Sequence, residues 1–262
     1  MPEAAYTPQE IMTVAAARRL KNGAVCFVGI GLPSAAANLA RLTHAPDVVL
    51  IYESGTIGAK PDVLPLSIGD GELAETADTV VSVPEIFRYW LQGGRVDVGF
   101  LGAAQVDKFG NINTTLIGGT YKTPTVRLPG AGGAPEIATA AKEVTIIVKQ
   151  TKRTFVEKLD FVTSSGFIEP GGNASWLSAG RRATTVISDL GILVSDAQTR
   201  ELVLTSLHPG VSLAEAREAS GWSLRVATTL GVTPAPTERE LAALRDLRAR
   251  TAAAHGESVT AE

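Results

Sequence analysis

The sequence contains few of the residues that build disulfide frameworks or metal sites. Cys26 is the only cysteine and lies in the apolar run Ala24 to Ile30, so a disulfide framework is excluded and a buried hydrophobic role is expected. The absence of disulfides favours a reducing, cytoplasmic setting. The three histidines show no metal-ligand spacing, which argues against a zinc site: His44, His208 and His255.

Long apolar runs and strong charge are also missing. The apolar runs fall far short of the ~20 residues that a membrane-spanning helix needs, and the N-terminus lacks the basic and apolar regions of a signal peptide. A formal net charge of -3 and the lack of long basic runs leave no basic field for a nucleic acid. We therefore expect neither a membrane nor a nucleic acid as a partner.

What remains is an ordinary globular composition. The 262 residues are 45% hydrophobic and 19% charged, which allows one large α/β domain or two small ones with a sizeable core. Short apolar runs rich in β-branched residues predict strands at 24–30, 48–52, 79–83, 97–106, 112–117, 144–149, 161–163, 184–190, 192–194 and 202–207. Helical segments are expected at about 32–42, 86–91 and 136–142, and a surface loop at 168–182.

Capping boxes, in which Ser or Thr precedes Glu by three residues, predict three further helix starts, at Thr7, Ser212 and Thr237. The helix after Thr7 is expected to end at Asn22-Gly23. The helix after Thr237 is expected to run to about Ala254, followed by a frayed end. Its leucines fall on one side and predict the face by which it packs: Leu241, Leu244 and Leu247.

Glu53 stands where the buried run Val48 to Tyr52 abruptly stops, and Ser54 and Gly55 follow it directly. This places a carboxylate at the carboxyl end of a strand, which is the edge where open α/β sheets bind their ligands. A lone Glu after a strand is also common as a solvated loop residue or as a partner of a helix N-terminus. Glu53 is therefore a candidate catalytic carboxylate that needs support from the rest of the chain.

Two glycine-rich turns supply that support. The segment 29–34 joins a strand to a helix, so its backbone N–H groups can hold an anion, although a turn that merely packs the helix explains it as well. A nicotinamide-binding fingerprint would have a third glycine here and an acidic residue about twenty positions later. The third glycine is missing and the acidic residue is Glu53 itself, so the match is poor. The segment 129–135, with prolines at both ends, favours an ordered anion-binding nest over a flexible linker.

A carboxylate nucleophile and N–H donors for an oxyanion are the two parts that acyl transfer needs. Three polar residues lie on the apolar hairpin near the centre of the chain, and we expect them to make turn and edge hydrogen bonds rather than substrate contacts: Gln105, Asn111 and Asn113.

Together these motifs resemble the beta subunits of class I CoA-transferases, on the branch that includes the 3-oxoadipate and glutaconate enzymes. The resemblance runs through almost the whole chain and rests on the segments 29–33, 53–55, 102–107 with 110–111, 130–134 and 206–211. It implies a single domain over residues 1–262. It also implies an α/β fold with an open, mainly parallel sheet flanked by helices, a short additional β segment and C-terminal helices.

The resemblance further implies a mechanism. Glu53 would attack the thioester carbonyl of succinyl-CoA to give a mixed anhydride, the CoA thiolate would convert this to a glutamyl-CoA thioester, and 3-oxoadipate would reverse both steps in ping-pong order. Gly132 and Gly133 match the oxyanion N–H donors. Five other positions match substrate-binding residues: Gly29, Gly31, Ser54, Gly55 and Gln105.

By the same resemblance, no metal or other cofactor takes part, and activity requires an alpha subunit in an assembly of two alpha and two beta chains. Alternatives stay open: a glutaconate-type or other dicarboxylate transferase, a CoA-thioester or ring-opening hydrolase of the same fold, and a non-catalytic CoA-binding subunit. The residue that clamps the distal carboxylate of the acid is also open among four cations: Lys60, Arg88, Arg127 and Lys149.

Overall fold

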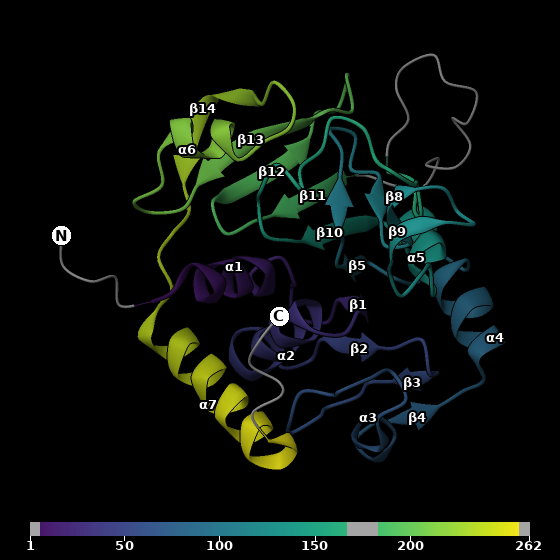
Figure 1. Ribbon diagram of the computed structural model, residues 1–262. Coiled ribbons are helices and arrows are strands. Elements are labelled where there is room, and N and C mark those ends of the chain that lie inside the picture. Colours follow the sequence, from purple (N-terminus) through teal and green to yellow (C-terminus); the bar gives the residue numbers. More distant parts are fainter. Residues whose placement is uncertain (1–5, 167–182, 257–262) are drawn as a thin grey trace. The chain divides into compact units, whose positions relative to one another are not determined.

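The computed structural model describes residues 6–166 and 183–256 (Figure 1). The loop expected at 168–182, and the frayed end beyond Gly256, lie outside the described residues. The chain divides into two compact units, of which the first holds residues 1–100 with 235–262 and the second residues 101–234. The expectation of a single domain stays a prediction, and each unit is described by itself.

The sheet of the first unit has the strand order β5-β1-β2-β3-β4. Strands β1 (Val25–Val28), β2 (Val49–Ile51) and β5 (Val98–Leu101) are parallel, and β3 (Thr56–Ile57) and β4 (Thr79–Val80) follow β2 in antiparallel fashion. The parallel strands are apolar and largely buried, as expected for parallel strands covered on both faces. Their carboxyl ends therefore meet at one edge.

Three long helices of the first unit, α1 (Pro8–Ala17), α2 (Leu32–Thr43) and α7 (Glu238–His255), pack against one another. The shorter elements are α3 (Gly71–Glu75), α4 (Val83–Glu85) and the π-helix η1 (Ile86–Leu91).

The predicted capping boxes at both ends of the chain are confirmed: the Thr7 and Thr237 hydroxyls accept hydrogen bonds from the backbone of the glutamate three residues on. The expected end of α1 was too late. After Ala17 the N–H groups of Arg19 and Leu20 bond to carbonyls three residues back, so the chain tightens and buries Leu20.

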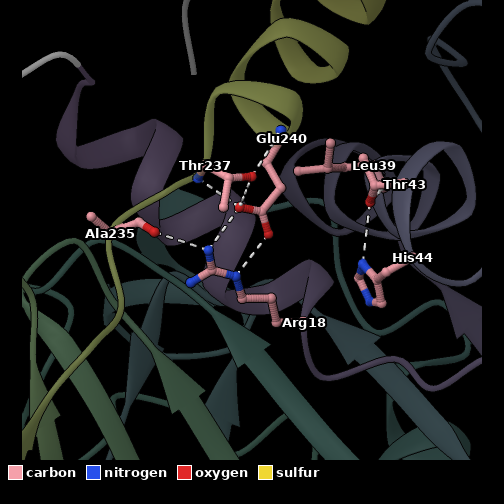
Figure 2. A network of polar contacts seen from close by, with 7 residues as sticks. All are labelled: Arg18, Leu39, Thr43, His44, Ala235, Thr237 and Glu240. Carbon is pink, nitrogen blue, oxygen red and sulfur yellow. Dashed lines mark hydrogen bonds and ion pairs between the residues drawn. The ribbon is translucent and has the colours of Figure 1, made fainter.

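The last helix is attached to the first unit by buried leucines and two ion pairs. Leu241, Leu244 and Leu247 are buried, which confirms the predicted face. Arg18 donates to both carboxylate oxygens of Glu240, at 2.8 and 2.7 Å, and to the Ala235 carbonyl at 3.0 Å (Figure 2). The Thr237 N–H and hydroxyl also donate to Glu240, both at 2.8 Å.

A second pair links the same helix to the first. Arg245 donates to the two carboxylate oxygens of Glu10 at 2.7 and 3.1 Å, and Glu10 is buried. The hydrogen bonds from Arg245 hold the pKa of the Glu10 carboxyl below its ordinary value. Each carboxylate also belongs to the capping box of its own helix, and the two pairs join both ends of α1 to the N-terminal half of α7.

The sheet of the second unit has the order β14-β13-β12-β11-β10. The outer pairs β13–β14 and β10–β11 are parallel and the inner pairs are antiparallel. The strands are β10 (Glu143–Ile147), β11 (Ala183–Ile187), β12 (Gly191–Ser195), β13 (Leu202–Leu207) and β14 (Arg225–Val232), and the helices are α5 (Ala134–Ala140) and α6 (Leu213–Glu218). The Ser212 capping box is confirmed.

Two small hairpins complete this unit: β6 (Gln105–Val106) with β7 (Ile112–Asn113), and β8 (Leu116–Gly119) with β9 (Pro124–Arg127). The strand expected at 112–117 was wrong as one piece, because the Asn113 side chain accepts from the N–H groups of Thr115 and Leu116 and breaks the strand there. The strand expected at 161–163 was also wrong, since only the isolated bridge from Ile112 to Ser164 forms.

The Arg18 and Glu240 pair predicts an acid-dependent stability. Burial raises the pKa of the Glu240 carboxyl, but the hydrogen bonds from Arg18 and Thr237 outweigh it and lower that pKa to about 2. A carboxyl with a lowered folded pKa stabilises the protein above its unfolded pKa, and this contribution is lost as the pH falls from about 4.5 to about 2. We expect Glu240→Gln to reduce the free energy of unfolding by about 1 to 2 kcal/mol at pH 7.

The measurement is urea unfolding at a series of pH values. The difference between wild type and Glu240→Gln should shrink as the pH approaches 2, whereas Glu238→Gln, an exposed acid on the same helix, should follow the wild type. A constant difference between wild type and Glu240→Gln across this range would contradict the assignment.

Candidate functional site

Glu53 lies in a tight loop between β2 and β3. The Tyr52 N–H donates to the Thr56 carbonyl at 3.2 Å, and the Gly55 N–H donates to the Tyr52 carbonyl at 3.0 Å, so three residues, Glu53 to Gly55, close the hairpin. Gly55 has a φ of +97°, the left-handed conformation that such a loop needs at its last position. The carboxylate is therefore carried on a short, hydrogen-bonded turn, where Glu53 is partly exposed.

The space around Gly55 leaves no room for a side chain. The Val81 N–H donates to the Gly55 carbonyl at 2.9 Å. A Cβ built on Gly55 would lie 1.9 Å from the Val81 carbonyl oxygen, far inside contact distance. The segment after β4 thus packs directly on the reactive turn.

This contact predicts that Gly55→Ala is much more destabilising than a typical glycine substitution. Gly23 is the matched control, since it has a φ of +76° but nothing within 4 Å of an added Cβ. Gly23→Ala should lower the free energy of unfolding by about 1 to 2 kcal/mol, because alanine disfavours the left-handed backbone. Gly55→Ala should lose the same amount and, because of the clash, ~2 kcal/mol or more in addition. Urea unfolding of both variants measures the two losses, and equal losses would count against the packing described.

The register of β1 and β2 carries a glycine to the same edge as the carboxylate. Phe27 is paired with Ile51, and Gly29 and Glu53 each follow two residues later, beyond the carboxyl ends of their strands. The Gly29 N–H donates to the Phe100 carbonyl at 3.2 Å. An added Cβ at Gly29 would lie 3.1 Å from that oxygen, so the position favours the smallest residue.

Gly31 begins the helix that follows. It is the N-cap of α2 with a φ of +81°, and no side chain caps this helix. The first-turn N–H groups of α2 thus face outward from the helix start with the polarity that suits an anion. Of the residues predicted for the site, the first unit brings Gly29, Gly31, Glu53, Ser54 and Gly55 to one edge; their substrate-binding roles stay predictions.

A buried polar network fixes the turn to α2. The Tyr52 hydroxyl lies 3.3 Å from the Ser34 hydroxyl and 3.5 Å from the Asn38 amide nitrogen, and all three residues are buried. The Asn38 amide also donates to the Ser34 carbonyl at 3.0 Å, and Arg41 donates to the Asn38 amide oxygen at 3.3 Å. Burial raises the pKa of Tyr52 to about 12, so the hydroxyl stays neutral. Sequence reasoning missed this role of Tyr52.

Tyr52→Phe tests how much this network contributes. Its contacts of 3.3 and 3.5 Å are long for hydrogen bonds, so the loss in free energy of unfolding should be at most ~1 kcal/mol. Thr251→Val is the control in the same unit, because the Thr251 hydroxyl is buried and makes two hydrogen bonds of 2.7 and 2.9 Å. In urea unfolding, Thr251→Val should lower the free energy of unfolding more than Tyr52→Phe does. If Tyr52→Phe gives the larger loss, the hydrogen bonds of Tyr52 are stronger than their distances indicate.

Two hydroxyls on the reactive hairpin have no hydrogen-bond partner among the described residues. The Ser54 and Thr56 oxygens are both buried. An unsatisfied buried hydroxyl is costly, although other described residues, such as Ser164, also contain a buried side-chain atom without a hydrogen-bond partner. Ser54 and Thr56 lie on either side of Gly55, within three residues of Glu53.

The second unit holds the other predicted site residues. Gly130 and Gly132 have φ angles of +109° and +49°, and Gly133 is the N-cap of α5. The Gly130 N–H donates to the Thr114 carbonyl at 2.9 Å, and the Thr114 hydroxyl returns a bond of 2.7 Å to the Gly130 carbonyl. The segment is thus an ordered turn and not a flexible linker. Gly132 is exposed and Gly133 is buried, and the oxyanion roles of both stay predictions.

Gln105 is buried and makes hydrogen bonds through both atoms of its amide group. Its oxygen accepts from Asn113 at 2.8 Å and from the Asp160 N–H at 3.1 Å, and its nitrogen donates to the Asp160 carboxylate at 2.9 Å. Asn111 likewise donates to the Asp107 carboxylate at 2.8 Å. These amides make the expected turn and edge hydrogen bonds, and the substrate-binding role of Gln105 stays a prediction.

The four candidate carboxylate clamps are all exposed. Lys60 pairs with Asp78 at 2.5 Å, and the guanidinium of Arg127 lies over the Tyr121 ring. Within residues 6–166 and 183–256, no three His, Cys, Asp or Glu side chains gather as metal ligands would. None of the helices in these ranges is long and apolar enough to cross a membrane.

A glutamate on a turn at the same edge as the glycine that begins α2 is consistent with the expected chemistry, and the comparison with known proteins decides the family. The coenzyme A transferase family matches residues 9–218. The chain belongs to this family. It is 68% identical over 254 residues to the beta subunit of 3-oxoadipate CoA-transferase from Pseudomonas knackmussii, covering 97% of each chain.

The beta subunit of glutaconate CoA-transferase from Acidaminococcus fermentans is 37% identical over 228 residues, covering 84% of this chain and 85% of that protein. The crystal structure of glutaconate coenzyme A-transferase from the same organism superposes with a TM-score of 0.84 at 33% identity, covering 92% of this chain and 94% of that chain. The expected fold class, an open, mainly parallel sheet flanked by helices of the class I CoA-transferase type, is thereby confirmed.

Proposed function

We propose that this chain is the beta subunit of a CoA-transferase that moves CoA from succinyl-CoA to 3-oxoadipate, with Glu53 as the nucleophile. The observation that carries the proposal is the position of Glu53 on a hydrogen-bonded turn at the carboxyl edge of the sheet, the edge that Gly29 also reaches. The 68% identity to a 3-oxoadipate CoA-transferase subunit supports the choice of acid.

The proposed reaction begins with attack of a Glu53 carboxylate oxygen on the thioester carbonyl. The carbon–sulfur bond breaks, so CoA leaves as a thiolate and a mixed anhydride of Glu53 and succinate remains. The thiolate then attacks the Glu53 side-chain carbonyl, which releases succinate and leaves a glutamyl-CoA thioester. The carboxylate of 3-oxoadipate attacks this thioester and reverses both steps, so that 3-oxoadipyl-CoA leaves and the Glu53 carboxylate is restored.

Each addition creates an oxyanion that needs N–H donors. Gly132 and Gly133 are the proposed donors, and one such donor is typically worth ~2.7 to 4 kcal/mol of transition-state stabilisation. Contacts to distant parts of CoA contribute by holding the thioester at the turn. The reaction as written needs no metal and no other cofactor.

The proposal includes a partner and a location. We place the chain in a cytoplasmic assembly with an alpha subunit, in two copies of each, which supports aromatic-compound catabolism through 3-oxoadipate. The two-subunit relatives named above support the alpha partner. The same relatives make glutaconate the alternative acid.

The decisive test is an intact-mass spectrum of the chain, co-expressed with its alpha subunit and incubated with succinyl-CoA without an acceptor acid. We expect an adduct of the mass of CoA on Glu53 that disappears when 3-oxoadipate is added. Glu53→Gln should form no adduct and lose activity by a factor of at least about 10³. Glu218→Gln, an exposed acid on α6, should behave as wild type.

Two other results would change the assignment. Release of CoA without an adduct indicates a thioester hydrolase. CoA binding with neither adduct nor turnover, unchanged in Glu53→Gln, indicates a non-catalytic subunit. If the adduct forms but glutaconate discharges it faster than 3-oxoadipate, the reaction stands and the acid is reassigned.

A further inference from the structure

The β8–β9 hairpin ends in an exposed aromatic and cationic tip that the chemistry at Glu53 does not use. Thr120 and Thr123 close the turn with backbone hydrogen bonds of 3.2 and 3.1 Å. Tyr121, at this turn, is 62% exposed. The guanidinium carbon of Arg127 lies 4.8 Å from the centre of the Tyr121 ring, and Arg127 also donates to the Tyr121 carbonyl. The stack is therefore held by the hairpin itself.

The segment that carries this tip is locally positive, although the chain is not. Between Asp107 and Glu136 the charged residues are Lys108, Lys122 and Arg127, with no acid among them, in a chain of net charge -3. An exposed aromatic ring with cations beside it is a surface that stacks a base and pairs with phosphate groups. The tip thus suits an anionic ligand that contains a flat ring.

The hairpin leads directly into the glycine turn. The pairing of its two strands continues through the hydrogen bonds between Thr114 and Gly130, at the other end from the tip. CoA is a long ligand, with its thiol and its phosphorylated adenosine at opposite ends of the pantetheine arm. A glycine turn at one end of the hairpin and a cationic, aromatic tip at the other match the two ends of that ligand.

Hydrogen bonds through Asp160 connect the β8–β9 hairpin to the buried amide of Gln105. The Asp160 carboxylate accepts from the Gly118 N–H at 3.2 Å and from the Gln105 amide at 2.9 Å. The Phe161 ring lies 5.8 Å from the Tyr121 ring, between ring centres. Anchoring of this kind reduces the entropy that is lost when a ligand binds.

We propose that Tyr121, Lys122 and Arg127 bind the phosphorylated adenosine of the CoA thioester. The exposed part of the Tyr121 ring stacks on the adenine, and the two cations pair with its phosphate groups. This inference rests on the proposed function, because it takes a CoA thioester as the substrate. It also assigns Arg127 to the nucleotide, which removes it from the candidates for the carboxylate clamp.

The test compares ligands with and without the nucleotide, using the chain assembled with its alpha subunit. Titration calorimetry should show that Tyr121→Ala binds CoA about tenfold more weakly than wild type. In the half reaction, kcat/KM for succinyl-CoA should fall by a similar factor through KM, while kcat/KM for succinyl-pantetheine stays the same. Arg127→Ala should show the same pattern.

Tyr89→Ala is the matched control, since Tyr89 is 58% exposed and lies in the first unit. It should leave both thioesters unaffected. Equal losses for the two thioesters, or no loss in CoA binding, would overturn the proposal. Loss of the alpha subunit from Tyr121→Ala in size-exclusion chromatography would also overturn it and make the tip a subunit contact. CoA binding that depends on Tyr121, without an adduct on Glu53, would retain the nucleotide site and reject the transfer reaction.

Discussion

The backbone of Gly55 is the constraint on which the reactive turn depends. Its positive φ lets the chain reverse directly after Glu53 and Ser54, and its carbonyl is bound by the segment that follows β4. The Val81 carbonyl occupies the space of any Cβ, so another residue would move one of these segments. A nucleophile gains most when its position relative to the substrate is fixed, and a turn of three hydrogen-bonded residues would do so for Glu53 in its proposed role.

The register of β1 against β2 then decides which residues reach the same edge as the carboxylate. Because Phe27 pairs with Ile51, Gly29 and Glu53 both lie just beyond the carboxyl ends of their strands, and Gly29 brings no side chain to that edge. Tyr52 points the other way and reaches Ser34 and Asn38 on α2. One strand end thus presents a reactive group on one side and an anchor on the other, in keeping with the alternation of side chains along a strand.

Local signals in the sequence predicted much of this. The apolar run that stops at Glu53 located the turn, and capping boxes located the starts of α1, α6 and α7, because a cap requires only residues three positions apart. The anchoring of Tyr52 could not be read in the same way. It depends on a contact with a helix fourteen to eighteen residues earlier. A buried Tyr and a buried Leu give the same pattern of hydrophobicity.

The errors have related causes. Residues 112–117 read as one strand by composition, yet the Asn113 side chain takes over hydrogen bonds that a strand would give to its neighbour. The strand expected at 161–163 is replaced by a single bridge at Ser164, whose partner Ile112 lies far away in the sequence. The edge strand β14 was missed because it is mostly exposed and lacks the apolar run on which the other predictions relied. Tertiary pairing outweighs local preference in each case.

In the proposed exchange, two different acids use the same nucleophile in turn. The groups that contact the reacting carbonyl must therefore serve both acids equally, and backbone N–H donors do so because they recognise only the oxyanion. The glycine turns at 29–31 and 130–133 would supply such groups in the proposed reaction. Selection between acids then depends on contacts farther along the acyl chain. For this reason the sequence indicates the reaction more readily than it indicates the substrate.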